Sequence, residues 1–275
     1  MVTIRNLQFG YNKKLIFNHF NFQVQPGHVC LVTGINGVGK STLLRLIAGV
    51  LKPQQGQIEY DPRLGASPRN KIGFISDSLS IYENLRVDRL IDLHLSVFNV
   101  KQFDDTLVRH TRISLRDKVR DLSKGQRTIL HLSLILSTHP ELLLIDEVIH
   151  DLDAYLRKLF LDEVIRHLTE REVTVIFVNV NFHDIESMVD RVVLLKDGAI
   201  AVDESIDILK EKVKRVLLAE DLPEGVPCIF SVSRENFTEY FLYPYDEKWG
   251  QSLPAEVTSL NLNDIVAAFI GGEYA

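Results

Sequence analysis

The chain has 275 residues, of which 45% are hydrophobic and 25% are charged. This composition is typical of a folded globular protein, and the length allows one large domain with a smaller one. Its 31 basic and 37 acidic residues give a net charge of −6, which excludes a general electrostatic attraction to nucleic acid or anionic lipid. The longest apolar runs, around Leu130–Leu136 and Leu142–Ile145, are far shorter than the roughly 20 residues of a membrane-spanning helix.

The chain contains two cysteines, Cys30 and Cys228. Near the N-terminus, Arg5, Lys13 and Lys14 interrupt the apolar residues, which is not the pattern of a secretory leader. We therefore expect a cytoplasmic protein in which both cysteines are buried, reduced thiols. The nine histidines are dispersed, and no group of histidines and cysteines has the spacing of a zinc site.

Apolar and polar residues alternate over residues 2–10 and 15–24. This period of two predicts a pair of antiparallel strands around a turn at residues 10–14. Tyr11 lies at that turn, where its ring is able to stack on an adenine. A surface tyrosine without a ligand is the alternative interpretation.

The most informative stretch is residues 31–42. The apolar run Val29–Val32 predicts a strand, Gly34-x-x-x-x-Gly39-Lys40-Ser41 follows it, and leucines at helical spacing continue to Ile47. This order is typical of a phosphate-binding loop, in which the N–H groups and dipole of a helix start attract phosphate. We expect Lys40 to reach the β- and γ-phosphates and the Ser41 hydroxyl to ligate Mg²⁺. The nucleotide contacts predicted here are Asn36, Gly37, Gly39, Lys40, Ser41 and Thr42.

Short strands are predicted at 58–60 and 71–76, and helical spacing then dominates residues 83–137. Within that segment, Ser123, Gly125 and Gln126 precede a strongly apolar helix, Thr128–Ser137. A serine cap, a glycine that permits close approach and free N–H groups are the features of a second phosphate-binding helix start. A capped helix without a ligand is an equally ordinary interpretation.

Four apolar residues, Leu142–Ile145, predict a strand that is buried on both faces of a parallel sheet. Asp146 and Glu147 then fall at its carboxyl end, where ligands bind in open α/β sheets. We expect Asp146 to hold Mg²⁺ and Glu147 to orient and activate an attacking water. A helix, a strand, a helix and a strand are predicted to follow, at residues 154–169, 173–180, 182–189 and 191–196.

The C-terminal residues predict a small α+β unit. Short strands are expected at 213–219, 228–233 and 240–245, with a closing helix at 260–270. The aromatic residues there favour strand formation and packing over a ligand cage; they are Phe237, Tyr240, Phe241, Tyr243 and Tyr245.

Taken together, these motifs resemble the nucleotide-binding subunit of ABC transporters over about residues 2–209. Tyr11 matches the A-loop aromatic and Gly34–Ser41 the Walker A loop. Leu122–Gln126 matches the signature loop, Leu142–Glu147 Walker B and Asp151–Asp153 the D-loop. The resemblance implies an α/β P-loop NTPase fold of the ABC type, with a mixed and parallel sheet. It also implies an ATP-binding domain at 1–209, a helical subdomain inserted at about 79–137, and a small C-terminal domain at 210–275.

The resemblance implies ATP and Mg²⁺ as cofactors and a head-to-tail dimer, homomeric or heteromeric, that sandwiches two ATP molecules. Ser123, Gly125 and Gln126 would then contact the γ-phosphate bound to the opposite subunit. A separate membrane subunit would place the cytoplasmic chain at the membrane periphery, with no nucleic-acid partner. The ending at residues 259–271 looks like that of drug- and peptide-exporter ATPases, which implies an exporter. Residues 77–86 would lie near the membrane partner, with Leu79, Ile81 and Tyr82 as docking residues or as a minor hydrophobic cluster.

The sequence departs from the family pattern at several positions. Asp77 stands where a Q-loop glutamine is usual, and its shorter reach weakens the expectation that it coordinates the metal directly. After Glu147, the usual Pro-Thr-Ser-Gly is replaced by Val148, Ile149, His150 and Asp151.

Val180 stands where the switch histidine of the H-loop is usual. A valine offers no group to the γ-phosphate, and loss of one preorganised donor costs about 2.7–4 kcal/mol of transition-state stabilisation. Slow hydrolysis would follow unless Asn179, Asn181 or His183 supplies a donor. A degenerate subunit that binds ATP but hydrolyses it poorly is therefore one alternative function. A non-transport ABC ATPase is another, although the net negative charge and the single cassette speak against it.

Overall fold

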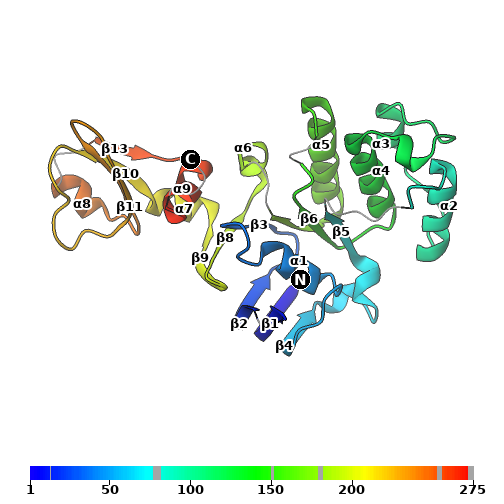
Figure 1. Cartoon of the computed structure of the whole chain (residues 1–275), viewed down its shortest axis with the longest axis horizontal. Helices are drawn as coiled ribbons and strands as arrows, with labels where there is room; N and C mark the ends of the chain where they lie inside the picture. The colour runs from blue at the N-terminus through cyan, green and yellow to red at the C-terminus, as the bar shows by residue number, and fades with distance from the viewer. Residues whose placement is uncertain (13, 77–81, 150–151, 179–181, 253–255, 272–275) are drawn as a thin grey trace.

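The computed structural model describes residues 1–12, 14–76, 82–149, 152–178, 182–252 and 256–271. A six-stranded sheet lies at the centre of the molecule (Figure 1). Its strands are β3 (Val29–Gly34), β5 (Ile72–Ser76), β6 (Leu142–Asp146), β7 (Thr174–Val178), β8 (Arg191–Lys196) and β9 (Ala199–Ser205). They run in the order β5-β6-β7-β3-β8-β9, with all neighbours parallel except β8 and β9. The carboxyl ends of β3, β6 and β7 therefore meet at one edge of the sheet.

A second, antiparallel sheet is formed by β1 (Val2–Tyr11), β2 (Lys14–Val24) and β4 (Gln55–Tyr60), in the order β2-β1-β4. The predicted antiparallel pair is confirmed. Tyr11 is paired with Lys14 at the end of the ladder, so the connecting turn is shorter than expected.

The central sheet is buried on both faces, as the apolar run of β6 predicted. Leu142 and Leu144 lie in one hydrophobic cluster, and Leu143 and Ile145 lie in another, because side chains alternate across a strand. The first cluster is closed by the antiparallel sheet and by α1 (Lys40–Ile47). The second is closed largely by α4 (Lys124–Ser137) and α5 (Ala154–Arg171).

The helical segment has a hydrophobic core of its own. Its other helices are α2 (Val87–Phe98) and α3 (Thr106–His110), and Leu130 and Leu134 of α4 lie in the same cluster as Val87 and Val108. Ile129 and Leu132 on the same helix belong instead to the large cluster under the central sheet. Helix α4 thus joins the helical segment to the sheet. Short 3₁₀ turns occur at Pro62–Leu64, Pro68–Lys71, Val119–Asp121 and Glu186–Met188.

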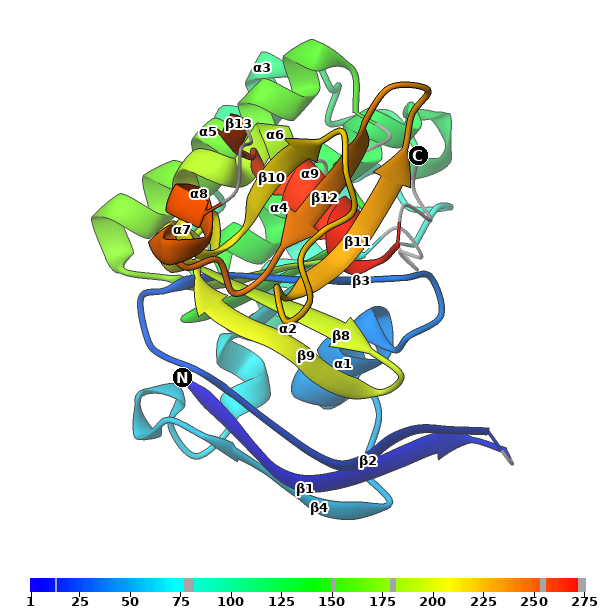
Figure 2. The same ribbon diagram turned by 90° about the vertical axis from the view of Figure 1, so that its left-hand side faces the viewer.

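The C-terminal part is an antiparallel sheet in the order β11-β12-β10-β13 (Figure 2). Its strands are β10 (Lys214–Leu218), β11 (Cys228–Ser233), β12 (Thr238–Leu242) and β13 (Glu256–Ser259), accompanied by α7 (Ile206–Lys212), α8 (Glu247–Ser252) and α9 (Leu262–Phe269). Val216 and Leu242 pack in a small separate cluster, whereas Leu262 and Ile265 of α9 join the large cluster under the central sheet. The closing helix therefore packs on the main core. The division at 209/210 stays a prediction.

Several expectations about individual elements need correction. The helix expected at 182–189 is a single turn, α6 (Phe182–Ile185), followed by a 3₁₀ turn. The strand expected at 240–245 is Thr238–Leu242, and β9, α7, α8 and β13 were not predicted. Cys30 is buried, as expected, but Cys228 is exposed because it begins the edge strand β11. Over the described residues, every helix is too short or too polar to cross a bilayer.

Candidate nucleotide site

The loop that joins β3 to α1 depends on glycine for its shape. Gly34, Gly37 and Gly39 have φ angles of 140°, 80° and 116°, a region that L side chains rarely adopt. A Cβ on Gly34 would lie 2.3 Å from the Leu195 carbonyl oxygen, and one on Gly39 would lie 2.6 Å from the Ile16 side chain. Strands β8 and β2 therefore hold the loop from two sides, contacts that the local spacing of the motif does not reveal.

The first turn of α1 is left available for an anion. Its N-cap is Gly39, no side chain caps the helix, and no acidic residue lies in the first turn. The leading N–H groups of a helix have no partner within the helix, so they and the dipole favour a phosphate at this position. Asn36 and Gly37 are exposed at the loop, and Thr42 is buried behind it.

Lys40 lies across the loop. Its Nζ donates to the carbonyl oxygens of Gly34 at 2.7 Å and of Ile35 at 2.9 Å, and the residue is only 4% exposed. Burial lowers the pKa of Lys40, and the nearby charges of Glu147 and Asp146 oppose that shift. An anion above the loop would add a further counter-charge for this buried ammonium.

Ser41 and Asp146 meet although 105 residues separate them. The Ser41 hydroxyl donates to Oδ1 of Asp146 at 3.1 Å, because β3 and β6 end at the same sheet edge with only β7 between them. Asp146 is 4% exposed; burial raises its pKa, while the hydrogen bond from Ser41 lowers it. A hydroxyl and a carboxylate are hard oxygen donors that suit Mg²⁺, which takes its other ligands from phosphate and water. The described residues contain no group of three or more His, Cys, Asp or Glu residues arranged for a metal.

Glu147 follows Asp146 in a different backbone conformation. Its φ of 61° is left-handed, and its N–H donates to the Val178 carbonyl at 3.2 Å. As a result the two neighbouring carboxylates differ in environment, with Asp146 buried and Glu147 exposed. Val148 and Ile149 then enter the core. A non-glycine residue in this conformation carries a strain cost, a feature that concentrates at functional sites.

The second predicted phosphate-binding segment is a helix start with a complete capping box. The Ser123 Oγ accepts from the Gln126 N–H at 3.2 Å, and Gln126 Oε1 accepts from the Ser123 N–H at 3.0 Å. Gln126 Nε2 also donates to the Thr111 carbonyl at 3.2 Å, so the glutamine side chain is already engaged within its own subunit. The serine cap is confirmed.

Gly125 also has a packing role that the sequence did not predict. A Cβ there would lie 2.6 Å from Cδ1 of Leu156, so this residue is small because α4 and α5 approach closely. Asp153 caps α5 by accepting from the Leu156 N–H at 2.9 Å. The glycine therefore sets helix packing whether or not a phosphate approaches it.

Tyr11 is 42% exposed and packs edge-on against Phe9, with ring centroids 5.1 Å apart. The ring is thus partly exposed while it contacts a neighbouring aromatic residue, an arrangement that permits stacking. His183 is exposed at the start of α6, and Tyr82 is 66% exposed. The remaining predicted positions lie outside the described residues: Asp77, Leu79, Ile81, His150, Asp151, Asn179, Val180 and Asn181.

Comparison with known proteins identifies the family. A family model described as "ABC transporter" matches residues 17–150. The aliphatic sulfonates import ATP-binding protein SsuB of Bacillus subtilis (strain 168) is 32% identical over 181 residues, covering 64% of this chain and 70% of SsuB. The chain belongs to the ABC transporter family. It carries the ATP-binding domain of that family, with its α/β P-loop NTPase fold.

Two further comparisons show how much of the chain is similar to other ABC proteins. The ribose import ATP-binding protein RbsA of Bacillus subtilis (strain 168) is 26% identical over 255 residues, covering 83% of this chain, which spans only 50% of RbsA. A dimeric ATP-binding cassette solved in a post-hydrolysis state with ADP and Pi aligns with a TM-score of 0.62 at 21% identity. That alignment covers 75% of this chain and 99% of the solved chain, and it establishes a shared fold.

Proposed function

We propose that this chain binds MgATP between Gly34 and Ser41 and hydrolyses it to drive transport through a separate membrane subunit. The Ser41–Asp146 hydrogen bond carries the proposal, since it places both predicted metal ligands at the end of the glycine loop. Three left-handed glycines and an uncapped helix start complete a phosphate site beside them.

Each residue has one task in this proposal. The N–H groups that begin α1 bind phosphate oxygens, and Lys40 turns from the carbonyls of Gly34 and Ile35 toward the β- and γ-phosphates. Ser41 and Asp146 hold Mg²⁺, which neutralises phosphate charge when it is bound. Glu147, exposed beside Asp146, orients a water and accepts its proton.

The signature loop has fewer free groups than its sequence suggests. Because the Gln126 side chain bonds to Ser123 and Thr111, we assign the contact with a second subunit's nucleotide mainly to the Ser123 hydroxyl and to the backbone N–H groups that begin α4. We propose a head-to-tail dimer at the membrane periphery, as the resemblance to ABC subunits implies; the solved cassette described above is itself dimeric. Homodimer and heterodimer remain separate outcomes of a size measurement on the purified chain.

The direction of transport is proposed as export, on the resemblance of residues 259–271 to the ending of exporter ATPases. SsuB and RbsA are both named as import proteins. Vesicles that contain the co-purified membrane subunit would decide the direction. MgATP added on the side of this chain should drive cargo away from that side, and movement toward it would overturn the export proposal.

Val180 favours a second candidate, a subunit that binds MgATP but turns it over slowly. ATPase activity of the purified chain should rise in a Val180→His variant if the missing histidine limits turnover. An ordinary rate in the wild-type chain alone would rule this candidate out.

The binding proposal is tested with a matched pair of lysine variants. Lys40→Ala should abolish or strongly weaken MgATP binding, because it removes the buried ammonium of the loop. Lys52→Ala removes an exposed lysine after the same helix and should leave binding unchanged. Equal affinity of the two variants for a fluorescent ATP analogue would contradict the assignment of the loop.

A further inference from the structure

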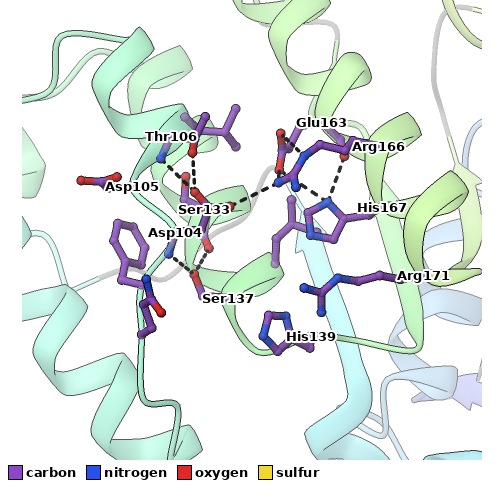
Figure 3. A pocket seen from close by; sticks show the side chains of 14 residues that line it. Asp104, Asp105, Thr106, Ser133, Ser137, His139, Glu163, Arg166, His167 and Arg171 are labelled. Carbon is purple, nitrogen blue, oxygen red and sulfur yellow. Dashed lines mark hydrogen bonds and ion pairs between the residues drawn. The ribbon is translucent and has the colours of Figure 1, made fainter.

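A cleft of about 470 Å³ lies beside α4 and α5 (Figure 3). Its walls come from residues 102–107 at the start of α3, from the C-terminal half of α4 with His139 just beyond it, and from α5. None of the residues assigned to MgATP lines it. The volume falls in the range of small-molecule sites, roughly 300–1,000 Å³.

One end of the cleft gathers basic groups. Arg171, His139 and His167 lie together there in Figure 3. Burial, and then the charges of Arg171, His167 and Lys71, lower the pKa of His139, so several groups repel positive charge at one place. Within the described ranges, Arg171 forms no ion pair with a carboxylate. An anion at this end would relieve the repulsion.

The neighbouring arginine does not share this property. Arg166 pairs with Glu163, with Asp104 at 3.2 Å and with Glu170 at 3.4 Å, so carboxylates already neutralise it. His167 is oriented by Glu163, whose carbonyl oxygen lies 3.1 Å from Nδ1. The cleft is therefore polarised, with acidic groups around Arg166 and an unneutralised cation at Arg171.

The wall opposite the basic end is rich in acceptors and hydroxyl groups. Asp104 accepts from Thr106 Oγ1 at 2.6 Å, and the Asp104 N–H donates to Ser137 Oγ at 3.3 Å. Ser133 lines the same wall and is 2% exposed, yet its Oγ has no hydrogen-bond partner among the described residues. A buried hydroxyl without a partner is unfavourable, and a hydroxyl group of a bound molecule would supply the missing hydrogen bond.

We propose that this cleft binds a small phosphate monoester that carries several hydroxyl groups, of the sugar-phosphate class. The phosphate lies at the end formed by Arg171 and His139. The hydroxyl groups face Asp104 and Ser133. A lone anion leaves the polar wall unused, and an uncharged polyol leaves Arg171 without a counter-charge.

The test uses the full chain with isotope-labelled histidines and follows the imidazole signals of His139 and His167 by NMR. Glucose 6-phosphate, glucose and inorganic phosphate are added in separate titrations. Glucose 6-phosphate should shift both signals saturably, inorganic phosphate should bind at least about tenfold more weakly, and glucose should cause no shift. Equal affinities for glucose 6-phosphate and phosphate, a shift with glucose, or no saturable shift would each overturn the proposal.

Variants locate the binding. Arg171→Gln should weaken glucose 6-phosphate binding by about tenfold or more, and Ser133→Ala should weaken it by a smaller factor. Arg89→Gln is the matched control, since that exposed arginine on α2 does not line the cleft. Wild-type affinity in Arg171→Gln would overturn the proposal. Loss of the shifts in Lys40→Ala would also overturn the proposal, because it would place the phosphate at the nucleotide loop. Shifts that persist in Lys40→Ala would support the cleft, even if the MgATP proposal itself failed.

Discussion

Burial of the ionised Asp146 carboxylate is unfavourable in the empty protein, and a bound cation would offset this cost. Burial is the largest influence on its pKa and raises it, and Ser41 offsets only part of this effect. The folded state therefore holds the proton more tightly than the unfolded state does. Stability of the empty protein is greatest when Asp146 is protonated and falls as the pH rises through its pKa in the unfolded and then the folded state.

Asp146→Asn should accordingly stabilise the empty protein at neutral pH. A gain of about 1 kcal/mol would raise the melting temperature by roughly 2–4 °C. The same variant should lose the stabilisation that Mg²⁺ and ATP give the wild type, because an amide is a poorer cation ligand. Thermal unfolding with and without MgATP measures both effects. Asp221→Asn, in an exposed loop, provides the control, and a lower melting temperature for empty Asp146→Asn would contradict the argument.

At the residue scale, the sequence predicts the polar residues of the site better than the packing contacts that hold the glycine loop in place. The spacing of Lys40 and Ser41 and the position of Asp146 after a buried run follow from strand and loop patterns, and the structure places these residues together. The contacts of Gly34 with Leu195 and of Gly39 with Ile16 join segments far apart in the chain. Local pattern holds no information on such packing.

Among the elements, the contact between α4 and α5 makes the sharpest mechanical prediction. Gly125→Ala should destabilise the fold by up to about 2 kcal/mol, because overpacking against the terminal methyl of Leu156 at 2.6 Å costs about 1–3 kcal/mol and the higher helix propensity of alanine offsets about 1 kcal/mol. The double variant with Leu156→Ala should lose less stability than the sum of the two single variants, because the shortened side chain opens space for the new methyl group. Chemical denaturation of the two single variants and the double variant measures the coupling. Additive losses would show that the two positions do not share one packing contact.

The helical segment contains a buried imidazole that makes it sensitive to acid. Burial in α4, with a smaller contribution from His94, lowers the pKa of His131 to about 4. Because the folded pKa lies below the ordinary value of about 6.5, stability is retained above that pH and lost as the pH falls toward 4. The loss has a slope of up to about 1.4 kcal/mol per pH unit.

His131→Leu should flatten this dependence between pH 6.5 and 4. Denaturant unfolding followed across that range tests it, with His28→Gln as the control because His28 is exposed. An unchanged slope in His131→Leu would show that the acid sensitivity arises elsewhere.

Regular elements were predictable where one face or both faces of a strand are buried. The period of two in β1 and β2 and the continuous apolar run of β6 gave the right strand types, since burial dictates both patterns. The C-terminal elements were less predictable. Strand β9 lies at the sheet edge and has only one buried residue, so burial imposes little apolar pattern on it, and α7 has only seven residues. Helix α9 owes its position to a core that gathers residues from many parts of the chain.

At the scale of the whole molecule, the proposed ATP site needs two chains. Each chain carries both halves of such a site, but at two different places on its surface. The loop and Glu147 belong to one half, and the capped start of α4 to the other. Glu147→Gln keeps the shape of the side chain but cannot take a proton from water, so it should bind MgATP without turnover. If a second chain completes the site, this variant should accumulate as an ATP-bound dimer. The dimer should disappear when Ser123→Arg is added, because the new side chain would fill the space that the nucleotide of the other subunit needs.

Size-exclusion chromatography with light scattering, with and without saturating MgATP, measures this outcome. Ser205→Arg is a suitable control, since Ser205 caps α7 in the same way that Ser123 caps α4 but lies outside the proposed dimer face. Ser123→Arg and Ser205→Arg each lose a capping hydroxyl worth about 1 kcal/mol, so a difference between the two variants reports on the interface and not on the cap. A Glu147→Gln chain that binds MgATP and remains monomeric would reject a site shared between two copies of this chain. It would direct the search to a heteromeric partner that supplies the second half of the site.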